Sequence, residues 1–139
     1  MTADTVIKID LKAIPLDEKS KALLQKGASL FSPELVEFKI IVREWELWEV
    51  SSEGRRLGVF ITRACVTYDG VKELVIMLTL SEYHLNMKLS NVLLPIYEAA
   101  ARLRGCQAVR IHTVHKPIEE FLERNGYRFQ ENIYIKKVS

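Results

Sequence analysis

The sequence has few cysteines, no long apolar run and almost no excess of charge of one sign. Its 2 cysteines, Cys65 and Cys106, each lie in an apolar stretch. We therefore expect them to be small buried core residues rather than metal ligands or a disulfide. No apolar run approaches the ~18 residues of a membrane-spanning helix. Charged side chains interrupt residues 1–15, which argues against a signal peptide and predicts a cytoplasmic protein.

The charge balance argues against nucleic acid or an anionic membrane as a partner. The chain has 20 basic and 18 acidic side chains and a net charge of +2, whereas nucleic-acid-binding domains usually have a clustered basic face. Arg102, Arg104 and Arg110 are the nearest approach to such a cluster, and we interpret them as a solvated face. The histidines and cysteines lack metal-ligand spacing, and the chain has no glycine-rich phosphate loop.

The length of 139 residues predicts a single domain over residues 1–139. Apolar–polar alternation predicts a strand over residues 6–14. Asp17 and Ser32 are the expected N-caps of two short helices that follow. The segment FKIIV after the second cap is compatible with either helix or strand.

Three strands are expected next, over residues 45–50, 57–66 and 73–80, and short turns between them predict an antiparallel meander. The third is a nearly continuous apolar run, which predicts burial on both faces. The first contains Trp45 and Trp48. We interpret both as core residues, with a recognition cleft as the alternative.

The last part of the chain predicts an amphipathic helix that ends at Gly105, with Leu103 on its inward face. Residues 108–114 then form a strand parallel to residues 73–80. A short helix over residues 117–126 and a final strand or hairpin complete the order. The predicted fold class is α/β, with a mixed, mostly antiparallel sheet.

The order of elements and the segment LRGCQAVRIHTVHKPIEEFLERNGYRF, residues 103–129, resemble the GNAT N-acetyltransferase superfamily. The resemblance implies a GNAT-like fold, in which the central strands splay apart and helices cover both faces of the sheet. It further implies that acyl-CoA, here acetyl-CoA, lies between the fourth and fifth strands. The acyl group would pass directly to an amine.

The resemblance also implies where the cofactor binds. The family's pyrophosphate loop normally reads Q/R-x-x-G-x-G/A, because glycines let the backbone close on the phosphates. This chain has LNMKLS there, residues 85–90, so the motif is absent. The positions that the resemblance assigns to the cofactor are Thr79, Leu80, Asn86, Lys88, Ser90, Asn91 and His115. The alternative is that Ser90 or Asn91 caps the helix and that Lys88 is solvated.

The catalytic residues also depart from the family pattern. Many members have a tyrosine in the helix after the fifth strand, which protonates the leaving thiolate, and Leu122 occupies that position here. Glu82, just past the fourth strand, is the candidate base, with a loop carboxylate as the alternative. Tyr83 and Tyr127 are the candidate proton donors. Tyr97 has a hydroxyl as well, but for Tyr97 and Tyr127 we favour core aromatics with a hydrated tip.

Three hypotheses remain for the function. The first is a divergent acyl-CoA-dependent N-acyltransferase with an unidentified amine acceptor. The second is a catalytically inactive GNAT-fold binding or assembly protein of phage or prophage origin, acting with a protein partner or as a homo-oligomer. The third is a small α/β domain that resembles the family only through common packing rules.

Overall fold

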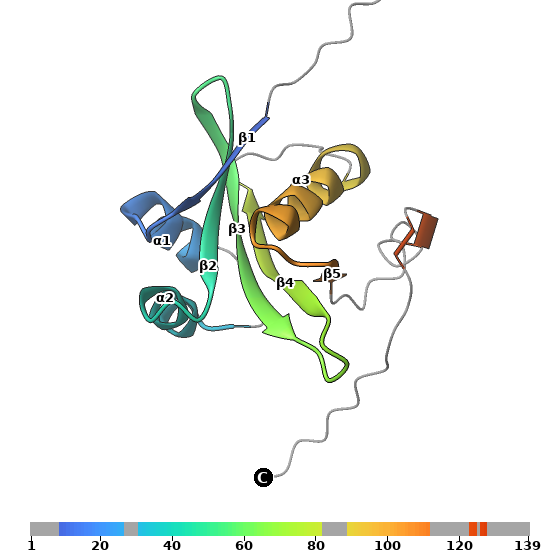
Figure 1. Ribbon diagram of the computed structural model, residues 1–139. Helices are drawn as coiled ribbons and strands as arrows, with labels where there is room; N and C mark the ends of the chain where they lie inside the picture. The colour runs from blue at the N-terminus through green and yellow to red at the C-terminus, as the bar shows by residue number, and fades with distance from the viewer. Residues whose placement is uncertain (1–8, 27–30, 82–88, 112–122, 125, 128–139) are drawn as a thin grey trace, which may run out of the picture.

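The computed structural model describes residues 9–26, 31–81, 89–111, 123–124 and 126–127, and for residues 81 and 89–92 it describes the backbone alone. It is a five-stranded sheet with helices on both faces (Figure 1). In chain order the elements are β1 (Ile9–Ile14), α1 (Glu18–Lys26), α2 (Pro33–Ile41), β2 (Glu46–Ser52), β3 (Arg55–Val66), β4 (Lys72–Ser81), α3 (Leu89–Leu103) and β5 (Ala108–Ile111).

The strands lie side by side in the order of the sequence, from β1 to β5. Neighbours from β1 to β4 are antiparallel. β4 and β5 are parallel, and α3 forms the crossover between them. This arrangement confirms the predicted meander, the predicted crossover and the mixed α/β fold class.

Both short helices begin as their sequences predict. The backbone N–H of Ser20 donates to Oδ1 of Asp17 at 2.8 Å, which caps α1. The backbone N–H of Leu35 donates to Oγ of Ser32 at 3.3 Å, and Pro33 occupies the first turn of α2. These caps satisfy amides that have no partner within the helix. The ambiguous FKIIV segment remains helical as far as Ile41.

β2 and β3 extend further toward each other than predicted, because the turn between them has two residues. Glu53 and Gly54 have φ angles of 52° and 77°, as a type I′ turn requires at both positions. Glycine adopts such an angle without steric cost. The tight turn places Ser52 directly opposite Arg55.

Two apolar clusters hold the sheet between the helices. The cluster beneath α3 includes Trp48, whose Nε1–H donates to Oγ1 of Thr62 at 2.9 Å. The cluster beneath α1 and α2 includes Trp45, and both tryptophans are buried, as the core interpretation predicts. One prediction of burial was wrong, since Leu103 is 61% exposed at the end of α3. Both cysteines are free and half-buried, and Cys106 packs against the cluster beneath α3.

The interpretation of three solvated arginines was also wrong in part. Arg104 forms two hydrogen bonds of 2.7 Å with the carboxylate of Glu46, and its guanidinium lies 4.7 Å from the centre of the Trp48 ring. Arg110 binds the carboxylate of the buried Glu73 at 2.6 and 2.9 Å. Arg102 alone is exposed as predicted. The described part of the chain contains no helix that is both long and apolar enough to span a membrane.

Candidate functional site

The candidate site lies at the end of β4, beyond the part of this strand whose pairing with β5 the structure describes. The described parallel pairing runs from Glu73 to Ile76, which faces Ile111, the last described residue of β5. β4 itself continues to Ser81. Within the described residues, its last part therefore has β3 as its only strand neighbour.

A β-bulge occurs at the same point in β4. On β3, Ile61 faces Leu78 but the next residue, Thr62, faces Ile76. Met77 is therefore an extra residue without a partner on β3. A bulge bends its strand and increases the local twist, so we expect β4 to change direction after Ile76.

The bulge also changes which side chains of β4 face α3. Before it, Leu74 and Ile76 belong to the cluster beneath α3. After it, Leu78 and Leu80 pack against the cluster beneath α1 and α2. Because side chains alternate along a strand, Thr79 then faces α3. The predicted burial of this strand on both faces holds through Ile76, whereas Thr79 is exposed.

Thr79 meets a buried tyrosine of α3. Its Oγ1 lies 2.6 Å from the hydroxyl of Tyr97, and either atom is able to donate the hydrogen bond. Tyr97 is 3% exposed, and its ring lies edge-on to Phe60 with centroids 5.2 Å apart. Burial raises the pKa of Tyr97, and the hydrogen bond with Thr79 opposes that shift. Tyr97 is thus a neutral hydroxyl at physiological pH.

A second tyrosine hydroxyl lies on the same face of the sheet. Tyr127 packs against the cluster beneath α3, and its hydroxyl is buried without a hydrogen-bond partner among the described residues. Burial, together with the nearby Glu98 and Tyr97, raises the pKa of Tyr127 to about 12. A buried polar atom without a partner is rare in a folded protein and carries a cost in stability.

The structure brings some of the predicted site residues together and separates others. Thr79 and Tyr127 share the α3 face with Tyr97, whereas Leu80 points to the opposite face. Five predicted residues lie outside the described part of the chain: Glu82, Tyr83, Asn86, Lys88 and His115. Ser90 and Asn91 lie in the first turn of α3, where only the backbone is described.

The described site is a set of neutral hydroxyls rather than a charged centre. Tyrosine and threonine hydroxyls donate and accept hydrogen bonds, and a tyrosine with a raised pKa keeps its proton at neutral pH. The first backbone amides of α3 follow closely after β4 and have no acceptor within the helix, a geometry that suits phosphate. The described residues include no group of three or more histidine, cysteine or acidic side chains placed to hold a metal.

Comparison by sequence finds no relative: no protein-family model and no curated protein matches the chain. Comparison by structure finds many similar chains. One is ribosomal-protein-alanine N-acetyltransferase from Brucella melitensis biovar Abortus 2308, with a TM-score of 0.69, 13% identity and coverage of 95% of this chain and 100% of that one. Another is a GNAT family acetyltransferase from Staphylococcus aureus subsp. aureus USA300_TCH1516, with a TM-score of 0.62 and 13% identity. That match covers 94% of this chain and 98% of the other one.

A third similar structure is AAC(6')-Iy in complex with a bisubstrate analogue, CoA-S-monomethyl-acetylneamine. Its TM-score is 0.66 at 11% identity, and the match covers 95% of this chain and 99% of that one. These similarities extend over nearly the whole length of both partners. They show that the chain has the fold of GNAT acetyltransferases.

Proposed function

We propose that this protein is an N-acyltransferase that takes an acetyl group from acetyl-CoA and passes it to an amine. The observation that carries the proposal is the buried hydroxyl of Tyr127, which has no partner among the described residues. It packs on the same face as the Thr79–Tyr97 hydrogen bond. A ligand at the end of β4 would supply an acceptor to this hydroxyl and offset the cost of burying it.

The fold supports the same proposal. Proteins with this fold include acetyltransferases from several organisms, and AAC(6')-Iy holds a CoA-containing analogue. Fold alone never fixes function. The proposal therefore depends on residues of this chain, namely the bulge at Met77 that turns Thr79 toward Tyr97.

We assign roles to these residues by chemistry. Acetyl-CoA supplies an activated thioester, which an amine attacks. The pKa of Tyr127 is raised to about 12, so its hydroxyl is protonated at neutral pH and is available to donate a hydrogen bond to the sulfur as negative charge develops there. Tyr97 positions Thr79 through their hydrogen bond.

The remaining roles belong to residues whose side chains the structure does not describe. Glu82 directly follows the last residue of β4, and we assign it the part of the base that deprotonates the amine. The amides at the start of α3 would hold the pyrophosphate. We assign contacts with the rest of the cofactor to Asn86, Lys88, Ser90, Asn91 and His115.

Thermal unfolding with and without acetyl-CoA tests the proposal, with CoA and ATP as controls. A ligand present at 100 times its dissociation constant adds about 2.7 kcal/mol to the free energy of unfolding. That raises the melting temperature of a domain of this size by several degrees. We expect this shift with acetyl-CoA but not with ATP, and release of free CoA when the right amine is added.

The variant Tyr127→Phe makes the test specific to the site. We expect it to fold, to bind acetyl-CoA more weakly and to release CoA more slowly. The absence of any shift at millimolar acetyl-CoA would refute the proposal for the wild-type protein. A catalytically inactive binding or assembly protein, with a protein partner or a second copy of this chain, would then be the hypothesis to pursue.

A further inference from the structure

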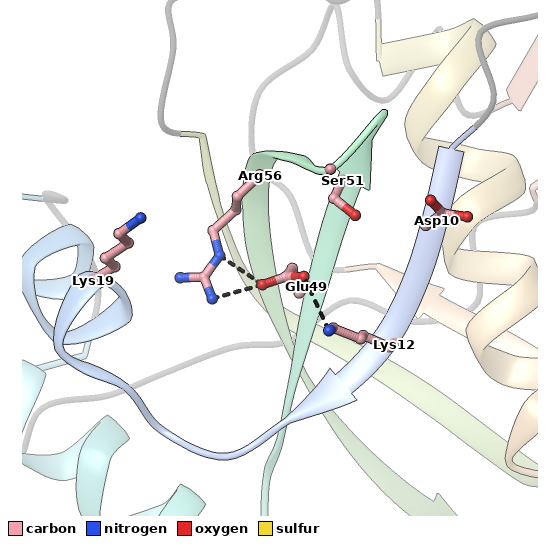
Figure 2. A pocket seen from close by; sticks show the side chains of 7 residues that line it. Asp10, Lys12, Lys19, Glu49, Ser51 and Arg56 are labelled. Carbon is pink, nitrogen blue, oxygen red and sulfur yellow. Dashed lines mark hydrogen bonds and ion pairs between the residues drawn. The ribbon is translucent and has the colours of Figure 1, made fainter.

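An open cavity of about 510 Å³ lies away from the candidate acyl-transfer site, between α1 and the β1–β2–β3 part of the sheet (Figure 2). Its size falls in the range of small-molecule sites, roughly 300–1,000 Å³, but most such sites have largely apolar walls. Here nearly every lining side chain is charged or polar: Asp10, Lys12, Lys19, Glu49, Ser51 and Arg56. A ligand that fits this cavity must itself be strongly polar.

Sheet register explains why these side chains gather on one face. Asp10 faces Ser51, and Ser51 faces Arg56, across three adjacent strands. Ile9 and Leu11, which alternate with Asp10 on β1, pack against the opposite cluster beneath α3. The polar residues of β1 therefore project to the face that α1 covers. On that face α1 contributes Lys19.

The floor of the cavity is an ion-pair network in which Arg56 pairs with two carboxylates. Arg56 donates from Nε to Glu49 at 2.8 Å and from Nη2 to Asp17 at 2.6 Å. Its side chain is only 13% exposed, and it also donates to the buried Ser20 at 3.4 Å. These bonds raise the pKa of Arg56, with the bond to Asp17 as the largest cause. The guanidinium is committed to the protein, so recognition falls to the walls.

The walls offer charges that the protein itself leaves available. Lys19 on α1 and Asp10 on β1 make no ion pair or side-chain hydrogen bond within the described part of the chain. Figure 2 shows them on opposite sides of the cavity, with Arg56 and Glu49 between them. Lys12 stands beside Asp10 on β1, is 68% exposed and approaches Glu49 only to 3.8 Å. The ammonium group of Lys19 and the carboxylate of Asp10 are thus open to a ligand, and Lys12 becomes available when it leaves its long, exposed pair with Glu49.

We propose that this cavity is a binding site for a small acidic zwitterion, that is, an acidic amino acid or a compound of the same charge pattern. Its two anionic groups pair with Lys19 and Lys12, and its ammonium group pairs with Asp10. A polycation meets two lysines and a single free carboxylate, so the lining disfavours it. The complementary charges set orientation and specificity, as charged groups do in other recognition sites.

This site is separate from the proposed acyl-transfer site. Thr79 and Tyr127 lie on the face covered by α3, whereas the cavity opens on the face covered by α1. Glu49 on β2 faces Val59 on β3, and Val59 in turn faces Leu80 on β4. With about 4.8 Å between neighbouring strands, the cavity floor is roughly 10 Å from β4. The inference therefore stands or falls independently of acyl transfer.

Ligand-detected NMR on the full chain tests the inference with three probes: L-glutamate, glutarate and spermidine. Glutarate has both carboxylates of glutamate but no ammonium group, and spermidine is a polycation. We expect binding of L-glutamate, weaker binding of glutarate and none of spermidine. Higher ionic strength should weaken the binding of L-glutamate, because exposed charges are screened.

Two variants and one matched control locate the binding. Lys19→Glu should weaken L-glutamate binding at least about tenfold. Lys26→Glu makes the same change at the exposed other end of α1, outside the cavity, and should leave it unchanged. Asp10→Asn should bring glutamate and glutarate to equal affinity. The inference is wrong if L-glutamate at about 10 mM shows no binding, since weaker binding would be of no interest. It is also wrong if the Lys19→Glu and Lys26→Glu variants bind L-glutamate with equal affinity.

Discussion

The hydroxyl groups of Thr79 and Tyr97 lie 2.6 Å apart and join the end of β4 to the middle of α3. The contact forms beyond the bulge at Met77. It holds the end of the strand against the helix that covers this face. The two partners differ greatly in exposure, since Tyr97 is 3% exposed and Thr79 is exposed to solvent.

That difference predicts unequal effects of removing either hydroxyl. Thr79→Val leaves the buried hydroxyl of Tyr97 without a partner, which should cost about 1–3 kcal/mol of unfolding free energy. Tyr97→Phe leaves the exposed hydroxyl of Thr79 free to bond with water and should cost about 1 kcal/mol or less. Urea unfolding of both variants measures the difference. Tyr68→Phe, at a fully exposed tyrosine, is the control, and equal costs at Thr79 and Tyr97 would contradict the assigned burial.

Tyr127 should make stability depend on alkaline pH. Its pKa is raised from 10.0 to about 12 by burial, Glu98 and Tyr97. A raised pKa means that the folded state holds its proton more tightly than the unfolded chain does. The contribution is therefore complete below pH 10 and is lost as pH rises toward 12.

Urea unfolding at pH 8, 10 and 11 checks this effect against Tyr127→Phe. The variant should lose less stability than the wild type between pH 10 and 11, because it lacks the titrating group. At pH 8 it should be as stable as the wild type or slightly more so, since it removes a buried hydroxyl that has no partner in the described part of the chain. A clear loss of stability at pH 8 would instead show that this hydroxyl has a partner in solution.

Much of the fold was predictable because its signals are local in sequence. The caps at Asp17 and Ser32 each depend on residues only three positions apart. The meander follows from short turns between apolar segments, and the crossover follows from a long helix between two strands. Leu103 was misplaced because it continues the apolar spacing of α3 into the last residue of the helix, where it is 61% exposed.

The site was less predictable because its geometry depends on an irregularity that the sequence conceals. Apolar residues surround Met77 on both sides, so the run ELVIMLTL shows no change of phase at the bulge. Without that change, Thr79 would point away from α3 and could not meet Tyr97. The spacing of Tyr97 from Leu93 and Ala100 indicates that it faces inward, but its partner is 18 residues away in sequence.

The cavity beneath α1 was missed for a similar reason. Asp10 and Lys12 alternate with apolar residues, which marks them as facing away from the α3 cluster. Their proximity to Arg56 requires the register of two strand pairs. Pairing of that kind cannot be inferred from one sequence, because it depends on turn geometry as well as on the apolar pattern.

Asp17 should make stability depend on acidic pH. Its pKa lies well below its ordinary value, chiefly because Arg56 donates hydrogen bonds to it. A lowered pKa in the folded state contributes stability above the ordinary value of 3.8, and that stability is lost as pH falls below it. Asp17→Asn keeps a capping side chain but removes the charge. Urea unfolding from pH 6 to pH 3 should show a shallower loss for this variant than for the wild type.

Asp10→Asn is the matched control for Asp17→Asn. It removes a carboxylate that makes no ion pair within the described residues, so its acid profile should follow that of the wild type. If the two variants lost stability in parallel, the ion pair between Asp17 and Arg56 would not be the source of the effect.

The ion pair between Glu73 and Arg110 should contribute more stability than the pair between Glu46 and Arg104, although both have two short hydrogen bonds. The side chain of Glu73 is 9% exposed and that of Glu46 is 36% exposed. Removing one member of a buried pair costs about 3–5 kcal/mol, because a charge loses its compensation away from water. A more exposed pair contributes about 1 kcal/mol or less.

Glu73→Gln and Glu46→Gln measure that difference by urea unfolding. We expect Glu73→Gln to cost several times more, with the loss concentrated where β4 and β5 pair. Glu73 faces Ala108 in the first pair of these strands, at the opposite end from the bulge at Met77. The proposed cofactor site depends on how β4 is held against β5, so Glu73→Gln should also weaken any response to acetyl-CoA. Equal losses of stability in the two variants would show that β4 and β5 are held by their backbone pairing alone.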